Sequence, residues 1–395
     1  MKRVFITGMG VISAIGNTVT ENHSALISGV CGITMPPHSS PDLSRVPLAE
    51  VSLSDELLRE RLQVFDPAVT RTSLLALHAF REAIQDAGLS EEEIRSNKTA
   101  LVGGTTVGGM SRSDELYRDV SERYAASPFL SSYDCSSVFL FLQEQYRMKG
   151  IVDTINTACS SAGNAIGYGM RLIRSGLAGK AIVGGADSLS KFTISGFNAL
   201  HILSSEICRP FDRSRQGLNL GEGAAFLVLE GEDEIPSDKK IYAEVKGYYN
   251  ASDAFHPTSL SANGEGPYLA MQGALAMAGL QAGEVDFINA HGTATENNDE
   301  SESRAMLRVF GEPPPFASTK SNTGHTLGAA AAVEAVYSLL SLEHQEIYPG
   351  LHFSAVIPGT ELQPVTTYYR SPLRHIMSNS FGFGGNCVSL IFSKS

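Results

Sequence analysis

The sequence predicts an α/β protein in which helices cover both faces of a central sheet. Short runs of β-branched and other apolar residues, such as "RVFITGMG" and "TALVGGTT", alternate with segments whose apolar residues recur at helical spacing. The strand-like runs are almost continuously apolar, which is typical of strands buried on both faces. Repeated alternation of strand and helix is the pattern of the α/β class.

The first predicted strand covers residues 3–10 and ends in two glycines, Gly8 and Gly10. These glycines resemble the opening of a dinucleotide-binding fingerprint. However, Ser13 stands at the third glycine position, and no acidic residue closes a strand about 20 residues later. We therefore interpret the glycines as a tight structural turn. The apolar run is also too short, and too broken by glycines, for a signal peptide.

The following elements continue the alternation. Residues 70–89 have apolar residues at helical spacing, and Gly88 is placed to end that helix. The polar segment 230–240 contains Pro236, and after it the rhythm of strand, helix and strand begins again. We therefore expect an N-terminal half, residues 1–235, and a C-terminal half, residues 236–395, that arose by duplication.

Composition excludes several functional classes. Hydrophobic residues make up 43% of the 395 residues, as in an ordinary globular protein, and no apolar stretch is long enough to span a bilayer. The formal net charge of −12 argues against a general nucleic-acid binder, although a small basic patch for an acidic protein partner remains compatible with it. The five cysteines are widely spaced without a CxxC pair, which argues against a disulfide framework or a zinc site and fits a reducing cytoplasm.

Cys159 lies in "NTACSSAGNAIGYGMRLIRSG", between a strand-like run and a helical pattern rich in small residues. A residue at such a junction sits on a sharp turn, which is the geometry of a nucleophile elbow. The free N–H groups and the dipole of the helix N-terminus would favour a thiolate. A buried, inert cysteine is the equal alternative from this segment alone.

Two histidines stand at similar junctions. His291 follows the strand-like "FINA", and His325 lies in a glycine-bearing turn before an alanine-rich helix. Each alone is more often a structural histidine, but strand ends and helix starts gather the sites of α/β folds, so the three side chains together indicate a site. A helix N-terminus near His325 would keep its imidazole neutral and able to donate a hydrogen bond to an oxyanion.

Other candidates lie near these residues. Lys320 and Glu334 flank His325 and could form a pair that holds the loop against the helix, or could be two unrelated surface charges. The segment 378–392, "SNSFGFGGNCVSLIF", is a glycine-rich turn before an apolar strand. It is either a hairpin corner or a movable loop whose backbone approaches a ligand.

The chain resembles the β-ketoacyl–acyl carrier protein synthases, over nearly its whole length. Six motifs carry the resemblance, in family order: "TACSS", "RPFDRSRQGLNLGEGAA", "DAFHPTS", "NAHGTAT", "STKSNTGHTLGAAAAVEA" and "NSFGFGG". The resemblance implies a thiolase fold, in which two similar halves form five αβαβα layers, and a dimeric decarboxylating condensing enzyme of fatty acid or polyketide biosynthesis. The implied partner is acyl carrier protein, with no metal and no redox cofactor.

The resemblance also implies roles for individual residues. Cys159 matches the acyl-accepting nucleophile, and His291 and His325 match the two active-site histidines, supported by Lys320 and Glu334. Phe383 matches the gating phenylalanine, whose N–H joins that of Cys159 in the oxyanion hole. The hydroxyls implied to hold the phosphopantetheine arm are those of Thr293 and Thr295.

The chain departs from the family pattern at two places. Asn386 and Cys387 follow Gly385 where the family often has threonine and asparagine. Phe139 and Phe141 fall near the expected dimer seam, and we predict that they restrict the acyl pocket more than Val107 at its floor; the alternative is that both rings fill the core. The predicted substrate-binding residues also include Phe197.

These departures leave the acyl group open between a standard fatty acyl chain and a specialised one, such as an unsaturated, aryl-primed or polyketide-like chain. The partner subunit is likewise open. It is either a second copy of this chain or a chain-length-factor-like homologue that lacks the nucleophile. Because this chain has Cys159 and both histidines, it is expected to be the active subunit in either case.

Overall fold

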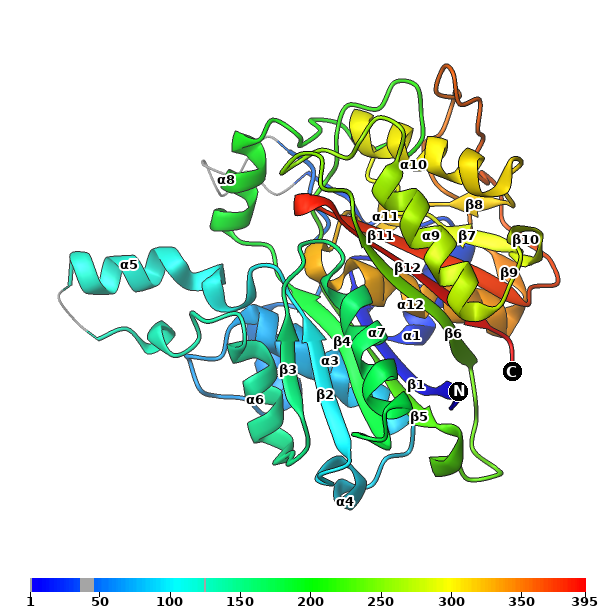
Figure 1. The fold of residues 1–395 in the computed structure, drawn as a ribbon. Helices are drawn as coiled ribbons and strands as arrows, with labels where there is room; N and C mark the ends of the chain where they lie inside the picture. The colour runs from blue at the N-terminus through cyan, green and yellow to red at the C-terminus, as the bar shows by residue number, and fades with distance from the viewer. Residues whose placement is uncertain (1, 36–45, 124–125) are drawn as a thin grey trace.

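The computed structural model describes residues 2–35, 46–123 and 126–395. Ten strands form one twisted mixed sheet in the order β3-β2-β4-β5-β1-β6-β12-β11-β7-β8 (Figure 1). The strands before residue 235 are β1 (Val4–Ser13), β2 (Thr99–Gly104), β3 (Val152–Ile155), β4 (Lys180–Asp187) and β5 (Gly223–Gly231). Those after it are β6 (Ala243–Ser252), β7 (Phe287–Asn289), β8 (Phe316–Ala317), β11 (His375–Gly382) and β12 (Asn386–Ser393). A separate small sheet pairs β9 (Glu346–Ile347) with β10 (Tyr369–Arg370).

The two halves of the sheet have the same topology. In the N-terminal half β2 pairs in parallel with β3 and β4, and β5 is antiparallel to both β4 and β1. In the C-terminal half β7 pairs in parallel with β8 and β11, and β12 is antiparallel to both β11 and β6. Strands β1 and β6 join the halves. This repeated order is what a duplicated fold requires, and the predicted boundary falls in the connection between β5 and β6.

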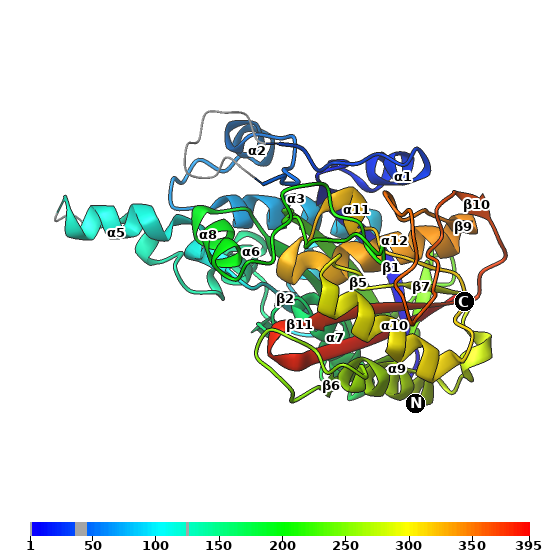
Figure 2. The ribbon, with the colours of Figure 1, turned by 90° about the horizontal axis from the view of Figure 1, so that it is seen from above.

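Helices complete five layers (Figures 1 and 2). Helices α3 (Arg71–Asp86) and α6 (Ser137–Tyr146) cover the outer face of the N-terminal strands, and α9 (Glu265–Ala278) and α10 (Glu296–Phe310) cover the outer side of the C-terminal strands. Between the two sets of strands lie α7 (Ser161–Arg174) and α12 (Ala330–His344), which pack against each other. The αβαβα architecture is therefore confirmed.

The remaining helices are not part of these layers. They are α1 (Val19–Ile27), α2 (Asp55–Leu62), α4 (Glu91–Ile94), α5 (Ser113–Ser121), α8 (Lys191–Ala199) and α11 (Lys320–Thr323), with 3₁₀ turns η1 (Gly108–Arg112), η2 (Pro128–Leu130), η3 (Glu232–Glu234), η4 (Ala282–Glu284), η5 (Leu327–Ala329) and η6 (Phe383–Gly385). Helix α5 projects from the body of the molecule in both views.

The sequence prediction of a turn at the first glycines is wrong. Strand β1 continues through Gly8 and Gly10 to Ser13. A Cβ atom on Gly8 would lie 2.5 Å from the Ala83 carbonyl oxygen, and one on Gly10 would lie 2.2 Å from that of Ala79. These glycines therefore let α3 approach the strand closely. The end of α3 agrees with the prediction, because Gly88 has φ 62° directly after the C-cap residue.

Candidate active site

The nucleophile candidate sits on a strained turn between β3 and α7. Ala158, directly before Cys159, has φ 54°, a left-handed conformation that costs energy for a residue with a side chain. The Ser161 side chain holds this turn, because its hydroxyl oxygen accepts a hydrogen bond from the Thr157 N–H at 3.0 Å and its hydroxyl donates to the Ala158 carbonyl at 2.5 Å. Cys159 is 6% exposed. The predicted sharp turn is therefore present.

The duplication explains why Cys159 and His325 meet. Cys159 lies between β3 and α7, and His325 lies between β8 and α12, which is the equivalent connection in the other half. Because α7 and α12 pack together in the middle layer, the segments that precede them come together. Reactive atoms of Cys159, His291 and His325 all lie within 4.8 Å of one another. The structure thus brings together the three residues that the sequence singled out.

A buried carboxylate holds the loop that carries His291. The Glu302 side chain, on α10, accepts hydrogen bonds from the backbone N–H groups of His291 and Gly292, both at 2.9 Å. Burial raises the pKa of Glu302 to about 7. Sequence reasoning missed this residue. The only available signal was its place eleven residues after His291, at helical spacing from the apolar residues Met306 and Val309.

Lys320 and Glu334 form a fully buried ion pair beneath the histidines. The Lys320 ammonium contacts the Glu334 carboxylate and donates to the His291 carbonyl oxygen at 2.6 Å. It also lies 3.2 Å from His291 Nδ1. An ammonium has hydrogen atoms to donate and no acceptor, so Nδ1 is the accepting nitrogen and the His291 proton resides on Nε2. The alternative of two unrelated surface charges is wrong.

His325 has the same tautomer for a different reason. Its Nδ1 accepts a hydrogen bond from the Leu327 N–H at 3.1 Å, which places the proton on Nε2. His325 is 2% exposed, and its Nε2 atom is buried without a hydrogen-bond partner among the residues that the structure describes. The two imidazole rings meet edge to face, with centroids 5.4 Å apart. A buried donor without an acceptor is costly, so this N–H is available to a ligand in the site.

The electrostatics of the site keep all three side chains neutral. Burial, reinforced by the nearby Lys320 charge, moves the pKa of His291 and of His325 well below the usual value. Burial also raises the pKa of Cys159 to about 11, against the opposing effects of Lys320 and of the Phe383 and Cys159 N–H groups. The N–H groups at this turn thus favour the thiolate, but the loss of hydration on burial outweighs them, and the pKa of the thiol stays above its usual value.

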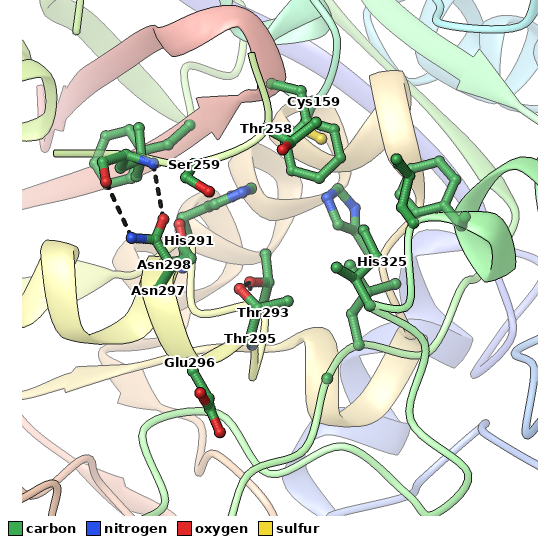
Figure 3. A pocket seen from close by; sticks show the side chains of 18 of the residues that line it. Cys159, Thr258, Ser259, His291, Thr293, Thr295, Glu296, Asn297, Asn298 and His325 are labelled. Atoms are coloured by element: carbon green, nitrogen blue, oxygen red, sulfur yellow. Dashed lines mark hydrogen bonds between the residues drawn. The ribbon is translucent and has the colours of Figure 1, made fainter. Parts of the chain in front are cut away.

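A cavity of about 500 Å³ opens beside these residues. Figure 3 shows Thr293, Thr295, Thr258 and Ser259 on the walls of the cavity that also holds Cys159 and His325. The hydroxyl oxygens of Thr293 and Thr295 lie 2.9 Å apart. The segment that carries Thr258 and Ser259 belongs to the motif "DAFHPTS", for which the sequence suggested no individual role.

The glycine-rich turn η6 forms another part of the cavity wall. Gly384 and Gly385 have φ values of 82° and 78°, which are accessible to glycine at little cost. The Gly384 N–H donates to the Pro257 carbonyl at 2.7 Å, and the Gly385 carbonyl accepts from the Asp253 N–H at 2.7 Å. The Phe383 ring stacks on that of Phe197, with centroids 6.1 Å apart, and both residues line the cavity. The turn is thus both a hairpin connection and part of the cavity.

Comparison with known proteins identifies the family. The β-ketoacyl synthase N-terminal domain family matches residues 1–234, and the β-ketoacyl synthase C-terminal domain family matches residues 242–354. The chain belongs to the β-ketoacyl synthases. It is 33% identical to 3-oxoacyl-[acyl-carrier-protein] synthase 2 of Staphylococcus aureus (strain COL), over 100% of this chain and 98% of that protein. It is also 33% identical to 3-oxoacyl-[acyl-carrier-protein] synthase 1 of Haemophilus influenzae (strain ATCC 51907 / DSM 11121 / KW20 / Rd), over 100% and 99% of the two chains.

Solved structures agree with this assignment. The structure of "the ishigamide ketosynthase/chain length factor" superposes with a TM-score of 0.92 at 33% identity, covering 100% of this chain and 99% of that one. The ketosynthase ApeO, solved in complex with its chain length factor ApeC from Xenorhabdus doucetiae, superposes with a TM-score of 0.86 at 30% identity, covering 100% and 98%. The chain is therefore a condensing enzyme of the acyltransferase type with the thiolase fold.

The predicted acyl-pocket residues of this ketosynthase lie in different places, and of these residues only Phe197 lines the cavity. Phe139, on α6, is completely buried in the outer core, where its ring contacts that of Phe226 and covers Gly103. Phe141 packs at the edge of the same core. Val107 lies in a small apolar cluster with Ile194, Leu218 and Leu327. Neither phenylalanine is among the residues that line the cavity beside Cys159 in this chain, and a role in the acyl pocket at a dimer seam stays a prediction.

The donor set of this ketosynthase site does not suit a metal ion. One cysteine and two histidines within 4.8 Å could in principle be ligands. Both imidazoles, however, face a hydrogen-bond donor at Nδ1 and keep the proton on Nε2, so a metal at Nε2 would require an imidazolate.

Within the part of the chain that the structure describes, no helix is both long and apolar enough to cross a membrane.

Proposed function

We propose that this β-ketoacyl synthase carries out both half-reactions of decarboxylative condensation with Cys159 as the nucleophile. In the first, Cys159 Sγ bonds to the acyl carbon of an acyl carrier protein thioester, and the carbon–sulfur bond to phosphopantetheine breaks. The thiol proton leaves with the departing pantetheine sulfur. Because the Cys159 thiol is protonated at rest, its deprotonation belongs to the attack and does not precede it.

The oxyanion of the tetrahedral intermediate is held by two backbone N–H groups. The N–H groups of Phe383 and Cys159 both interact with Sγ in the free protein, where they lower the thiol pKa against the effect of burial. An oxyanion formed on a carbonyl carbon attached to Sγ would lie within their reach. Backbone donors that are already aligned need no reorganisation when charge develops.

The histidines act in the second half-reaction. Malonyl carrier protein loses CO₂, and the electron pair of the broken bond is delocalised onto the thioester oxygen as an enolate. The Nε2–H groups of His291 and His325 donate to that oxygen. The enolate carbon then bonds to the acyl carbon on Cys159, the carbon–Sγ bond breaks, and the released thiolate takes up a proton from solvent. No resident metal or redox cofactor takes part in these steps.

The unpartnered Nε2–H of His325 is the observation that carries this proposal. A buried donor left free in the unliganded protein is stabilised only when a ligand supplies an acceptor. Its neutral state, set by burial and Lys320, lets it donate without giving up a proton to the enolate. Thr293 and Thr295, at the cavity wall, are placed to hydrogen-bond the amides of the phosphopantetheine arm.

The proposed assembly is a cytoplasmic dimer that receives substrates from acyl carrier protein. Strand β3 lies at one edge of the sheet. The elements α5 and η2 expose apolar side chains, including Tyr117 and Leu130 at 76% and 71% exposure. A second copy of this chain would cover them. The alternative partner is a homologous chain-length factor, which is favoured by the two structural relatives solved as ketosynthase and chain-length-factor assemblies.

Intact-protein mass after mixing with a panel of acyl carrier proteins tests the proposal. The wild type should gain the mass of the acyl group, and Cys159→Ala should not, while its thermal unfolding stays close to that of the wild type. Loading of Cys159→Ala would refute the nucleophile assignment. Native mass of the purified chain distinguishes a homodimer from a chain that requires a different partner.

A further inference from the structure

Asn386 occupies the first position of β12, directly after η6, which is called the gating turn below. It joins this turn to residues 156–160, the nucleophile turn that carries Cys159. Its Oδ1 atom accepts hydrogen bonds from Asn164 Nδ2 at 2.9 Å and Asn250 Nδ2 at 2.8 Å. It also lies 2.8 Å from Ser160 Oγ, whose single hydrogen is shared between this oxygen and the Thr157 carbonyl oxygen at 2.7 Å. Ser160 follows Cys159 directly, and Asn164 lies in the first turn of α7. One side-chain oxygen thus connects the nucleophile turn, α7 and β6 to the end of the gating turn.

The network has little freedom to rearrange. Asn164 Nδ2 also donates to Thr157 Oγ1 at 2.8 Å, and Asn250 Nδ2 also donates to Asn164 Oδ1 at 2.7 Å, so both amide groups use both of their hydrogen atoms. Turning the Asn386 amide over would point its NH₂ group at these donors. The acceptor at position 386 is therefore required by its neighbours.

The two turns also touch through their backbones. A Cβ atom on Gly382 would lie 2.6 Å from the Thr157 carbonyl oxygen and 3.3 Å from Ala158 Cβ. Phe383 and Cys159, whose N–H groups are the proposed oxyanion donors, follow Gly382 and Ala158 in sequence. The distance between the two donors consequently depends on how the turns are held against each other, and Asn386 is the side chain that bonds across them.

We propose that Asn386 is a positioning residue that sets the spacing of the Phe383 and Cys159 N–H groups. This inference rests on the proposed oxyanion hole. Asn386 does not contact the substrate; it acts through the backbone on either side. Loss of its oxygen should therefore slow acyl transfer, in which both donors hold the oxyanion, much more than alkylation of the Cys159 thiol, in which they only lower the thiol pKa.

The test compares two rates on the same protein. Acylation of Cys159 by the N-acetylcysteamine thioester of octanoate, or of acetate if octanoate is excluded, is followed by intact mass. Alkylation by iodoacetamide is followed in the same way. Asn386→Ala should lower the ratio of acylation to alkylation by about 10- to 100-fold, because a donor is displaced but not removed. If Asn386→Ala does not fold, the volume-conserving Asn386→Leu is measured instead.

Two further variants make the comparison specific. Asn386→Asp keeps the accepting oxygen, so its ratio should stay near that of the wild type even if its charge slows both reactions. Tyr248→Phe removes a hydrogen bond of 2.7 Å to Asn164 Oδ1 at the far side of the network, and should leave the ratio unchanged. An unchanged ratio in the Ala and Leu variants, or an equal loss in Tyr248→Phe, would overturn the inference. Failure of the wild type to be acylated at Cys159 would instead refute the proposed function.

Discussion

The buried pair of Lys320 and Glu334 lets stability be separated from catalysis. Lys320→Met leaves the Glu334 carboxylate, with a side chain 3% exposed, without its ammonium partner. Within the described ranges, this carboxylate keeps a hydrogen bond of 3.4 Å from Ser380 Oγ. Removing one member of a buried pair costs about 3–5 kcal/mol, so the free energy of unfolding should fall by about that amount. His291 Nδ1 also loses its donor, and the tautomer that presents Nε2–H is no longer enforced.

The double variant Lys320→Met/Glu334→Gln removes both charges. Replacing a buried ion pair by neutral groups of similar volume is often close to neutral in stability, so most of the lost free energy of unfolding should return. Malonyl decarboxylation should remain depressed, because neither replacement donates to His291 Nδ1. Chemical denaturation gives the stability, and CO₂ release from malonyl carrier protein gives the activity.

The free energy of unfolding should depend on pH in a way that only the single variant Lys320→Met shows. In Lys320→Met, burial raises the pKa of Glu334 with no opposing charge from Lys320. The folded state then binds a proton more tightly than the unfolded state, so the stability deficit should shrink as the pH falls from 8 to 5. The double variant has no carboxylate there and should lack this trend. Recovery of decarboxylation together with stability in the double variant would refute the argument that Lys320 acts through His291.

Three further predictions follow from the geometry of the site. Because burial raises the pKa of Cys159 to about 11, its iodoacetamide alkylation rate should keep rising between pH 8 and pH 10; a plateau below pH 8 would contradict this. His291→Ala and His325→Ala should each slow malonyl decarboxylation by about 100- to 1,000-fold and acyl loading much less, since each removes one donor to the enolate; normal CO₂ release from both variants would exclude the assigned roles. Phe139→Ala should lower the free energy of unfolding by about 3–5 kcal/mol without changing the set of acyl groups loaded, as a thermal melt and an acyl panel would show; a broadened panel in a stable variant would restore the pocket role.

Much of the candidate site could be predicted because its chemistry is local in sequence. Cys159 and His291 each follow a strand closely, and His325 stands just before a helix, so α/β packing rules were enough to group them. The six motifs in family order then implied the fold, which the repeated strand order confirms. The misinterpreted glycines in β1 show the limit of the method. In the sequence alone, a glycine that allows a helix to pack closely against a strand cannot be distinguished from a glycine that forms a turn. The position of the packed helix is needed to tell them apart.

The sequence by itself determined the α/β class and the candidate reactive groups, because strand and helix periodicity and the residues at element ends are local properties. The five-layer architecture was implied by the family resemblance. Only the tertiary structure decided their chemical state. The Cys159 thiol, the neutral imidazoles and the Nε2–H tautomers all depend on burial and on Lys320, which no local pattern measures. The Asn386 bond to Ser160 joins residues 226 positions apart. Such contacts form only when the two halves of the chain pack together. The role of Asn386, which departs from the family pattern, could therefore be inferred only from the tertiary structure.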